Sequence, residues 1–229
     1  MKKLTISSEL AYFLSLAFIS LSVAMASAAD FGVSMIAAPT YILSLKFDFF
    51  TFGQWEYCVQ AGLFVVMCLL LKKFKAVYLM SFLSSIIYGT MLDIWRLIIP
   101  MLNPALTAPG SMDMFTRLWI FVVAEILIGI ALALIFHSYL LPQIYDFFVK
   151  AVTEHFNIDL IKFKRLYDLT FLVVAVALSL LLFRGFVGIG VGTIIITIVN
   201  GPVIGVFNNL AEKYVDFKPT FKGLAKFFE

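Results

Sequence analysis

Long apolar stretches of about 20 residues alternate along the chain with shorter polar segments, and each is long enough to cross the roughly 30 Å hydrocarbon core of a bilayer as a helix. Apolar residues make up 62% of the chain and charged residues 14%, far from the composition of a soluble domain. We therefore predict an all-α integral membrane protein. Its six transmembrane helices are expected at residues 10–29, 53–71, 76–99, 117–140, 169–184 and 190–210.

The chain repeats itself weakly at an offset of 112 residues. The offset aligns Gly89 with Gly201, Phe74 with Phe186, Ser81 with Thr193, Ser85 with Thr197, Tyr88 with Asn200 and Trp95 with Phe207. A half with three spans ends on the opposite side of the membrane from its start. The second half therefore begins on that opposite side and has the inverted orientation. We predict an inverted 3+3 repeat, with residues 1–112 as the first half and 113–229 as the second.

Basic residues are distributed unevenly over the predicted connections. With the N-terminus inside, thirteen Lys and Arg residues fall on the inner side and four fall on the outer side. Cytoplasmic connections carry the excess of basic residues in membrane proteins. Both termini are therefore predicted to be cytoplasmic. The net charge of +3 gives no sign of a nucleic-acid partner, and the lipid bilayer is the expected surroundings.

The N-terminus fits two interpretations. Its first 28 residues resemble a secretory signal, with two lysines, an apolar run and small residues at a cleavage position. Against cleavage, Glu9 stands where the apolar run begins, and small residues that suit helix packing share one face. That face consists of Ser15, Ser22, Ala26 and Ala29. We favour a retained first helix, and cleavage of residues 1–28 stays the alternative.

In each half, the connection between the first and second spans is unusual. Residues 31–52 are too apolar for an exposed loop, and Gly32 and Pro39 interrupt them, so we predict an outer re-entrant or interfacial half-helix. Residues 143–168 place apolar and charged side chains on different helical faces. This pattern predicts a cytoplasmic amphipathic helix, on the membrane or packed under the bundle. The tail after Leu210 is predicted to be interfacial.

Short glycine-centred motifs give the chain a resemblance to a known family. The segment FGVSMIAAPTYILS at 31–44, Thr51-Phe52-Gly53 at 51–53, Gly89 with Asp93, and GIGVGT…NGP at 188–202 look like the YczE/YitT-like family of bacterial multi-pass membrane proteins. In the first motif, Met35 replaces a proline of the family pattern, and Pro39 comes one position early. The resemblance implies a bacterial plasma-membrane protein with repeat symmetry, and it implies no known substrate.

Glu125 is the single residue that most suggests a function. It lies inside the fourth span, with no basic residue within two turns of its own helix. An ionisable side chain inside a membrane is costly unless it is protonated, paired or facing water, and such residues mark substrate and ion pathways. Glu125 would suit proton coupling or recognition of a cationic solute. The alternative is a structural hydrogen bond to a neighbouring helix.

Two stripes of polar side chains are candidates for a solute path where the halves meet. They consist of Ser81, Ser85 and Tyr88 in the third span and Thr193, Thr197 and Asn200 in the sixth. The spacing within each stripe places its members on one helical face. Hydroxyl groups also hold membrane helices together without any ligand, so packing is the alternative role.

Further charges lie close to the predicted outer boundary. Asp93 and Arg96 are three residues apart on one helix, which predicts an ion pair, with a gate as the alternative role. Asp30, Glu56 and Arg184 are interpreted as ordinary interfacial charges, with a place at an entrance as the alternative.

Other chemistries have little support in the sequence. Cys58 and Cys68 lie in one apolar span and there are only two histidines, so we expect neither a disulfide framework nor a metal site. Gly188, Gly190 and Gly192 lack the spacing and strand context of a dinucleotide-binding fingerprint. The chain has no nucleophile elbow, zinc-protease motif or P-loop, so we expect no enzymatic activity and no cofactor.

These observations together predict a small-molecule transporter or a solute-binding membrane component. Its site would lie at mid-membrane between the repeats, formed by Glu125 and the two stripes. The alternative is a non-transporting accessory protein that binds a partner protein in the membrane. The identity of the solute is not written in the sequence.

Overall fold

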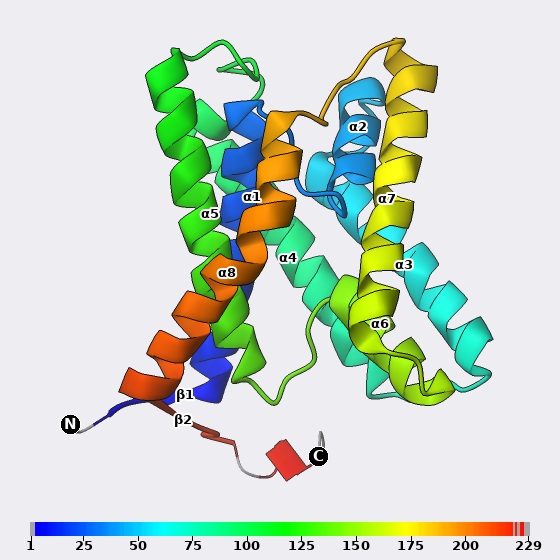
Figure 1. Ribbon diagram of the computed structural model, residues 1–229, viewed down its shortest axis with the longest axis vertical. Helices are drawn as coiled ribbons and strands as arrows, with labels where there is room; N and C mark the ends of the chain where they lie inside the picture. Colours follow the sequence, from blue (N-terminus) through cyan, green and yellow to red (C-terminus); the bar gives the residue numbers. More distant parts are fainter. Residues whose placement is uncertain (1–2, 222, 224, 227–229) are drawn as a thin grey trace.

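The computed structural model describes residues 3–221, 223, 225 and 226, and Figure 1 shows the path of the chain. Within this part, two short strands, β1 (Leu4–Ser7) and β2 (Val215–Lys218), accompany eight α-helices and a 3-10 turn at Pro100–Leu102. The helices are α1 (Ser8–Ala29), α2 (Ala38–Lys46), α3 (Phe52–Leu71), α4 (Tyr78–Ile98), α5 (Met114–Phe136), α6 (Ile144–Phe156), α7 (Leu160–Phe183) and α8 (Val191–Tyr214).

Five of these helices, α1, α3, α5, α7 and α8, are long and apolar enough to cross a membrane. The chain is therefore a mostly helical, multi-pass membrane protein. The third expected span, at residues 76–99, corresponds to α4, a helix of 21 residues whose bounds match the prediction closely, but α4 is not among these five. Its serine-rich face, Asp93 and Arg96 make it less apolar than its neighbours.

Helix α1 lies at the centre of the bundle, packed against both α4 and α5 (Figure 1). Ser15, Ser22, Ala26 and Ala29, the predicted small-residue face, are all buried, and Ser7 caps the helix by accepting a hydrogen bond from the Leu10 amide at 3.2 Å. Helix α1 therefore provides packing surface for both α4 and α5.

The two ends of the chain meet at one end of the molecule, where β1 pairs with β2 in parallel (Figure 1). The Glu9 carboxylate joins them: it accepts hydrogen bonds from the Tyr139 hydroxyl at 2.6 Å and from the amides of Thr220 and Phe221 at 3.0 and 2.9 Å. The predicted interfacial tail is thus tied to the start of α1. Residues 222, 224 and 227–229 of that tail lie outside the described part of the chain.

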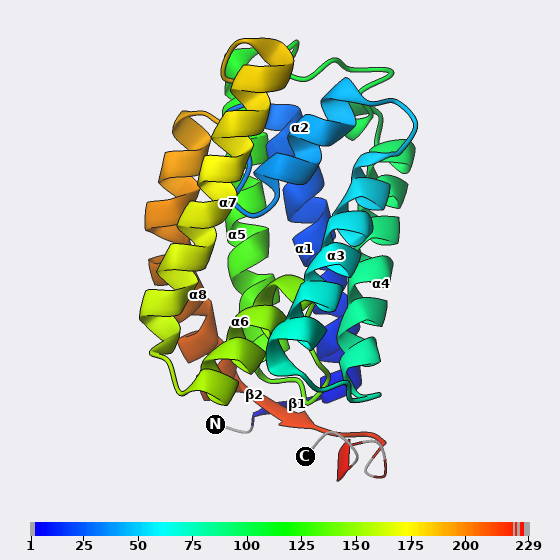
Figure 2. The ribbon, with the colours of Figure 1, turned by 90° about the vertical axis from the view of Figure 1, so that its right-hand side faces the viewer.

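The first unusual connection contains the short helix α2, which Figure 2 shows beside α7 in the upper half of the bundle. Residues 38–42 of α2 are buried, so the helix is inserted among its neighbours and does not lie on the surface. Before it, residues 31–33 run against the start of α8. The Gly192 amide donates to the Phe31 carbonyl at 2.7 Å, and the Val33 amide donates to the Gly188 carbonyl at 3.1 Å.

The second connection, residues 143–168, is predicted to be one amphipathic helix, and the structure differs from this prediction. The connection divides at Asn157, whose backbone is left-handed at φ 53°, into α6 and the first turns of α7. Asp159 starts α7 by accepting from the Lys162 amide at 2.7 Å, nine residues before the expected start at 169. The hydropathy pattern misses these turns because they are basic. Helix α6 packs against α3, α4 and α7, which agrees with a helix under the bundle.

Helices α3 and α4 cross closely at a pair of glycines. A Cβ atom at Gly53 would lie 1.9 Å from the Gly89 carbonyl oxygen, and a Cβ at Gly89 would lie 2.5 Å from the Gly53 carbonyl oxygen. Only glycine leaves room for two backbones at this distance. In contrast, α7 and α8, which the structure describes in full, are not packed along each other (Figure 1).

We expect Gly53→Ala to lower the free energy of unfolding by about 1–3 kcal/mol, the usual cost of overpacking. The added methyl group would collide with the Gly89 carbonyl oxygen. Gly62→Ala is the control on the same helix, since a Cβ there meets no atom within 4 Å. Thermal unfolding of the purified variants measures the difference. Equal stability of the two variants would contradict the close crossing.

Candidate functional site

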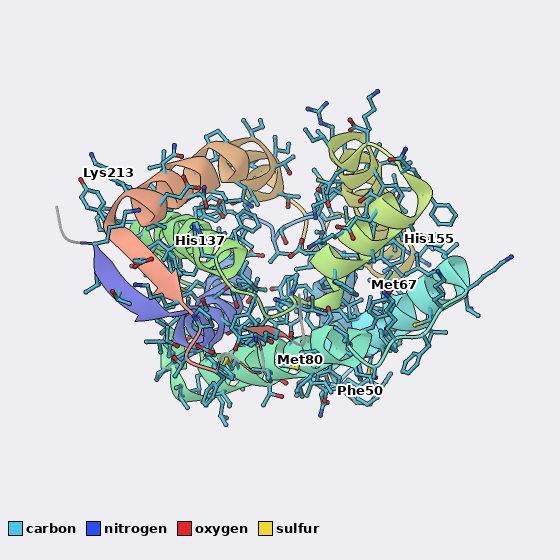
Figure 3. The ribbon with its side chains drawn as sticks, turned by 90° about the horizontal axis from the view of Figure 1, so that it is seen from below. Phe50, Met67, Met80, His137, His155 and Lys213 are labelled. Carbon is cyan, nitrogen blue, oxygen red and sulfur yellow. The ribbon has the colours of Figure 1, made fainter. Side chains whose placement is uncertain are left out.

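A cavity of about 450 Å³ lies inside the bundle, lined by residues from α1 and from α3 through α8, and by the segment 33–37 that leads into α2. Seen from below in Figure 3, α5 and α8 lie on one side of the molecule's centre, and α6 and α7 lie on the other. Most of the lining is apolar. The polar side chains of the lining differ in their burial and in their hydrogen-bond partners.

Glu125 of α5, the candidate chosen from the sequence, lines this cavity. Its side chain is 8% exposed, and it makes no hydrogen bond or ion pair with any described residue, so its Oε2 atom is buried without a partner. Glu125 therefore does not form a structural hydrogen bond to any described residue of a neighbouring helix, which was the alternative interpretation. A buried, unpartnered carboxyl oxygen carries a cost that a ligand or water in the cavity can remove.

A second carboxyl in the cavity belongs to Glu56 of α3, which is completely buried. Glu56 Oε1 lies 2.6 Å from the Thr40 hydroxyl, and that hydroxyl also lies 2.8 Å from the Ala37 carbonyl oxygen. One hydroxyl has a single proton for two acceptors. A proton on Glu56, donated to Thr40, satisfies both contacts. Glu56 Oε2 has no hydrogen-bond partner among the described residues.

The interpretation of Glu56 as an outer interfacial charge is therefore wrong. The signal that could have found it is Gln60, four residues later on the same helical face and also completely buried. Gln60 accepts from the Ser85 hydroxyl at 2.5 Å and donates to Gln143 Oε1 at 3.3 Å. Two polar side chains on one face of an apolar helix indicate contact with protein or with a polar cavity.

Tyr145 and Gln143 bring the start of α6 into the cavity wall. Burial raises the pKa of Tyr145 well above its usual value. The phenol therefore keeps its proton at neutral pH and remains a hydrogen-bond donor beside Glu56.

The stripe on α4 divides between two roles. Tyr88 lines the cavity, whereas Ser81 and Ser85 are completely buried outside it. The Ser81 hydroxyl donates to the Pro142 carbonyl, and Ser85 Oγ accepts from the Ile144 amide at 3.2 Å. These two serines fix the connection between α5 and α6.

The stripe on α8 divides in the same way. Thr197 and Asn200 line the cavity, and Asn200 Oδ1 is buried without a partner among the described residues. Thr193 lies outside the cavity, where its hydroxyl donates to the Val33 carbonyl at 2.8 Å. Thr193 thus holds the segment before α2 against α8.

Asp93 and Arg96 do not form the predicted ion pair: no nitrogen and oxygen atoms of the two side chains, both described, lie within 4.0 Å of each other. Asp93 instead binds the start of α3, accepting from the Gly53 amide at 2.9 Å and from the Thr51 hydroxyl. The Arg96 guanidinium lies 5.3 Å from the centre of the Phe52 ring. Both side chains therefore contact the start of α3 instead of each other.

Three charged residues at the α6 and α7 side of the cavity form an ion-paired group that the sequence did not single out. Lys164 Nζ lies 3.1 Å from Asp168 and 3.6 Å from Asp146, and all three residues line the cavity. The break between α6 and α7 brings Asp146 back over the first turns of α7. In the described part of the chain, no three His, Cys, Asp or Glu side chains are grouped to hold a metal ion.

Comparison with known proteins places nearly all of the chain in one family. The model of a family of unknown function, DUF6198, matches residues 6–209. No curated protein matches the chain, and neither does any solved structure. The likeness to the YczE/YitT-like family stays a resemblance based on short motifs.

The different placements of the two stripes predict different accessibility. With Cys58 and Cys68 replaced by Ala, Thr197→Cys is expected to react with a small water-soluble thiol reagent many times faster than Ser85→Cys. Thr197 lines the cavity, whereas Ser85 is completely buried in packing. Labelling of the purified protein followed by mass spectrometry gives both rates, and comparable rates would place both residues in the same environment.

Proposed function

The chain belongs to the DUF6198 family, and we propose that it is a membrane transporter for a small molecule, or the solute-binding component of one. The observation that carries the proposal is that Glu56 and Glu125, from the two halves of the chain, line one cavity, each with an oxygen left without a partner. Unsatisfied polar groups destabilise a fold, so their presence is best explained by a ligand or a proton that they bind.

We further propose that the chain is the inverted 3+3 repeat expected from its sequence, with α4 also spanning the membrane. Both halves have the order long, short, long, long: α1 to α4 and then α5 to α8. The packing supports this pairing, because α1 packs on α4 as α5 packs on α8, and α3 packs on α6 as α7 packs on α2.

Aligned residues of the two halves also have matching roles. Ser81 donates to the Pro142 carbonyl of the second half, and its partner at the offset of 112, Thr193, donates to the Val33 carbonyl of the first half. Tyr88 and its partner Asn200 both line the cavity. These reciprocal contacts support a two-fold relation between the halves.

The halves differ in one place, and this difference supports alternating access. Helices α3 and α4 are closed against each other at Gly53 and Gly89, whereas α7 and α8 are apart. At the same offset, Arg165 of α7 corresponds to Gly53, and Gly201 of α8 corresponds to Gly89. Exchange of the two arrangements would open the cavity on the opposite side of the membrane.

The proposal includes a location in the cell membrane with both termini in the cytoplasm. Two observations support the orientation. The basic residues are concentrated in the connections on the side of β1 and β2, and these two strands, near the two ends of the chain, lie together at one end of the molecule (Figure 1). The alternative of an accessory protein that binds a membrane partner is less favoured, since a purely structural role does not require a cavity lined by unpaired carboxyls.

Glu125→Gln is expected to abolish uptake of the solute into proteoliposomes while the protein remains folded. The solute is first identified as the compound that raises the thermal stability of the purified protein in a metabolite panel. Because Glu125 makes no hydrogen bond to the described protein, its replacement costs the fold little. Glu154→Gln on the outside of α6 is the control, since that side chain is 66% exposed. Normal uptake by Glu125→Gln would remove this carboxyl from the mechanism.

Alternating access predicts that α7 and α8 meet in a second state. In a background without Cys58 and Cys68, the pair Arg165→Cys and Gly201→Cys is expected to be cross-linked by an oxidant and to lose transport until it is reduced. The matched single variants should show neither effect. Gel mobility and uptake measure the outcome, and a transporting double variant that never cross-links would contradict the exchange.

A further inference from the structure

We infer that the substrate of the cavity is a small organic ammonium ion, with N–H donors at one end and an apolar body. This inference rests on the proposed function, which it extends by naming the class of substrate. It draws on three features of the cavity: the hydrogen-bonding groups left unused, the sign of the charges around it, and the nature and size of its walls.

Apart from the Tyr145 hydroxyl, which can also donate, the unused groups of the cavity are acceptors. Glu56 Oε2, Glu125 Oε2 and Asn200 Oδ1 all belong to lining residues, and none has a hydrogen-bond partner among the described residues. Acceptors are satisfied by donors, and an ammonium group offers up to three N–H bonds from a single centre. A carboxylate or phosphate substrate would bring further acceptors to the same place.

The charges around the cavity favour a cation. Its ionisable acids are Glu56, Glu125, Asp146 and Asp168, and its single cationic side chain is Lys164. Lys164 is already paired with both aspartates, at 3.6 and 3.1 Å, so it leaves no free positive charge for an anionic ligand. A cation entering the cavity would meet Glu125, a carboxyl without a counter-ion, together with the unpartnered oxygen of Glu56. A charge-assisted hydrogen bond to a carboxylate is among the stronger ones.

The walls and the volume of the cavity favour a ligand with an organic body. Ile128 and Leu132 of α5 face the cavity together with Ile196 and Ile204 of α8. A volume of about 450 Å³ is within the range of sites for small organic molecules. An alkyl or arylalkyl group on the ammonium would cover these apolar walls and gain the free energy of their burial.

Four probes of similar shape test the class of ligand on the purified protein. They are 2-phenylethylammonium, its N,N,N-trimethyl analogue without N–H donors, the neutral 2-phenylethanol and the anionic phenylacetate. Thermal stabilisation and titration calorimetry measure binding. The primary ammonium is expected to stabilise the protein most, the trimethyl analogue less, and phenylacetate not at all.

The variant Glu125→Gln is expected to weaken binding of 2-phenylethylammonium at least about tenfold, as the loss of a charged partner does. Glu56→Gln is expected to weaken binding less, because protonated Glu56 offers the ligand a neutral acceptor. Glu154→Gln, a surface carboxyl, should leave it unchanged. If Glu56→Gln fails to fold because of its contact with Thr40, Glu125→Gln alone carries the test, since Glu125 has no protein hydrogen bond to lose.

The variant Ile204→Trp distinguishes a failure of this inference from a failure of the proposed function. Ile204 lines the cavity from α8, which has few buried residues, so the larger indole ring would fill the cavity and block any ligand that binds there. Stabilisation by phenylacetate or phenylethanol equal to that by the ammonium, and lost in Ile204→Trp, would overturn the substrate class while leaving the cavity as a solute site. If no probe binds and no compound of a metabolite panel stabilises the wild type, both proposals fail.

Discussion

The rest of the structure depends on one constraint: inside hydrocarbon, a polar group must find a partner within the protein, because no water is available to take its place. Many polar side chains in the interior obey it. Ser84 donates to the Leu141 carbonyl at 2.9 Å, and Thr193 and Asp93 bind backbone groups of neighbouring segments. Glu56 and Glu125 are exceptions that line the same cavity, and this is why the cavity, more than any motif, suggests what the protein does.

The same constraint explains how irregular backbone is tolerated at the core. Residues 31–37 and the segment 139–143 leave carbonyl and amide groups without helical partners. Hydroxyls of α4 and α8 satisfy part of them, through Ser81, Ser84, Ser85 and Thr193. Non-helical backbone at membrane depth requires such support or a water-filled cavity. The polar stripes of both helices therefore serve first to hold the two connections, and their remaining members face the cavity.

Much of this arrangement could be predicted from the sequence, and the failures have physical causes. Span positions follow from hydropathy alone, and the cavity position of Glu125 follows from the cost of a carboxyl in an apolar helix. The start of α7 was misplaced because its first turns are basic, although Asp159 caps them. Glu56 lies close to the predicted start of its span, which suggests a place at the membrane surface. The prediction fails because α2 and α6 pack against α3 and enclose the side chain. Ser85 and Asp93 found partners on other segments, which spacing within one helix cannot reveal.

The glycines of α8 bear on the proposed exchange of packing between the two halves. Glycine inside an exposed helix is less favourable than alanine by roughly 0.5–1 kcal/mol, so it calls for a close approach by another backbone. Gly89 on α4 has that approach, from Gly53. Gly201 and Gly205 on α8 have none, since a Cβ at either would meet no atom within 4 Å. If the halves exchange their packing as proposed, these two glycines become part of the contact surface for α7.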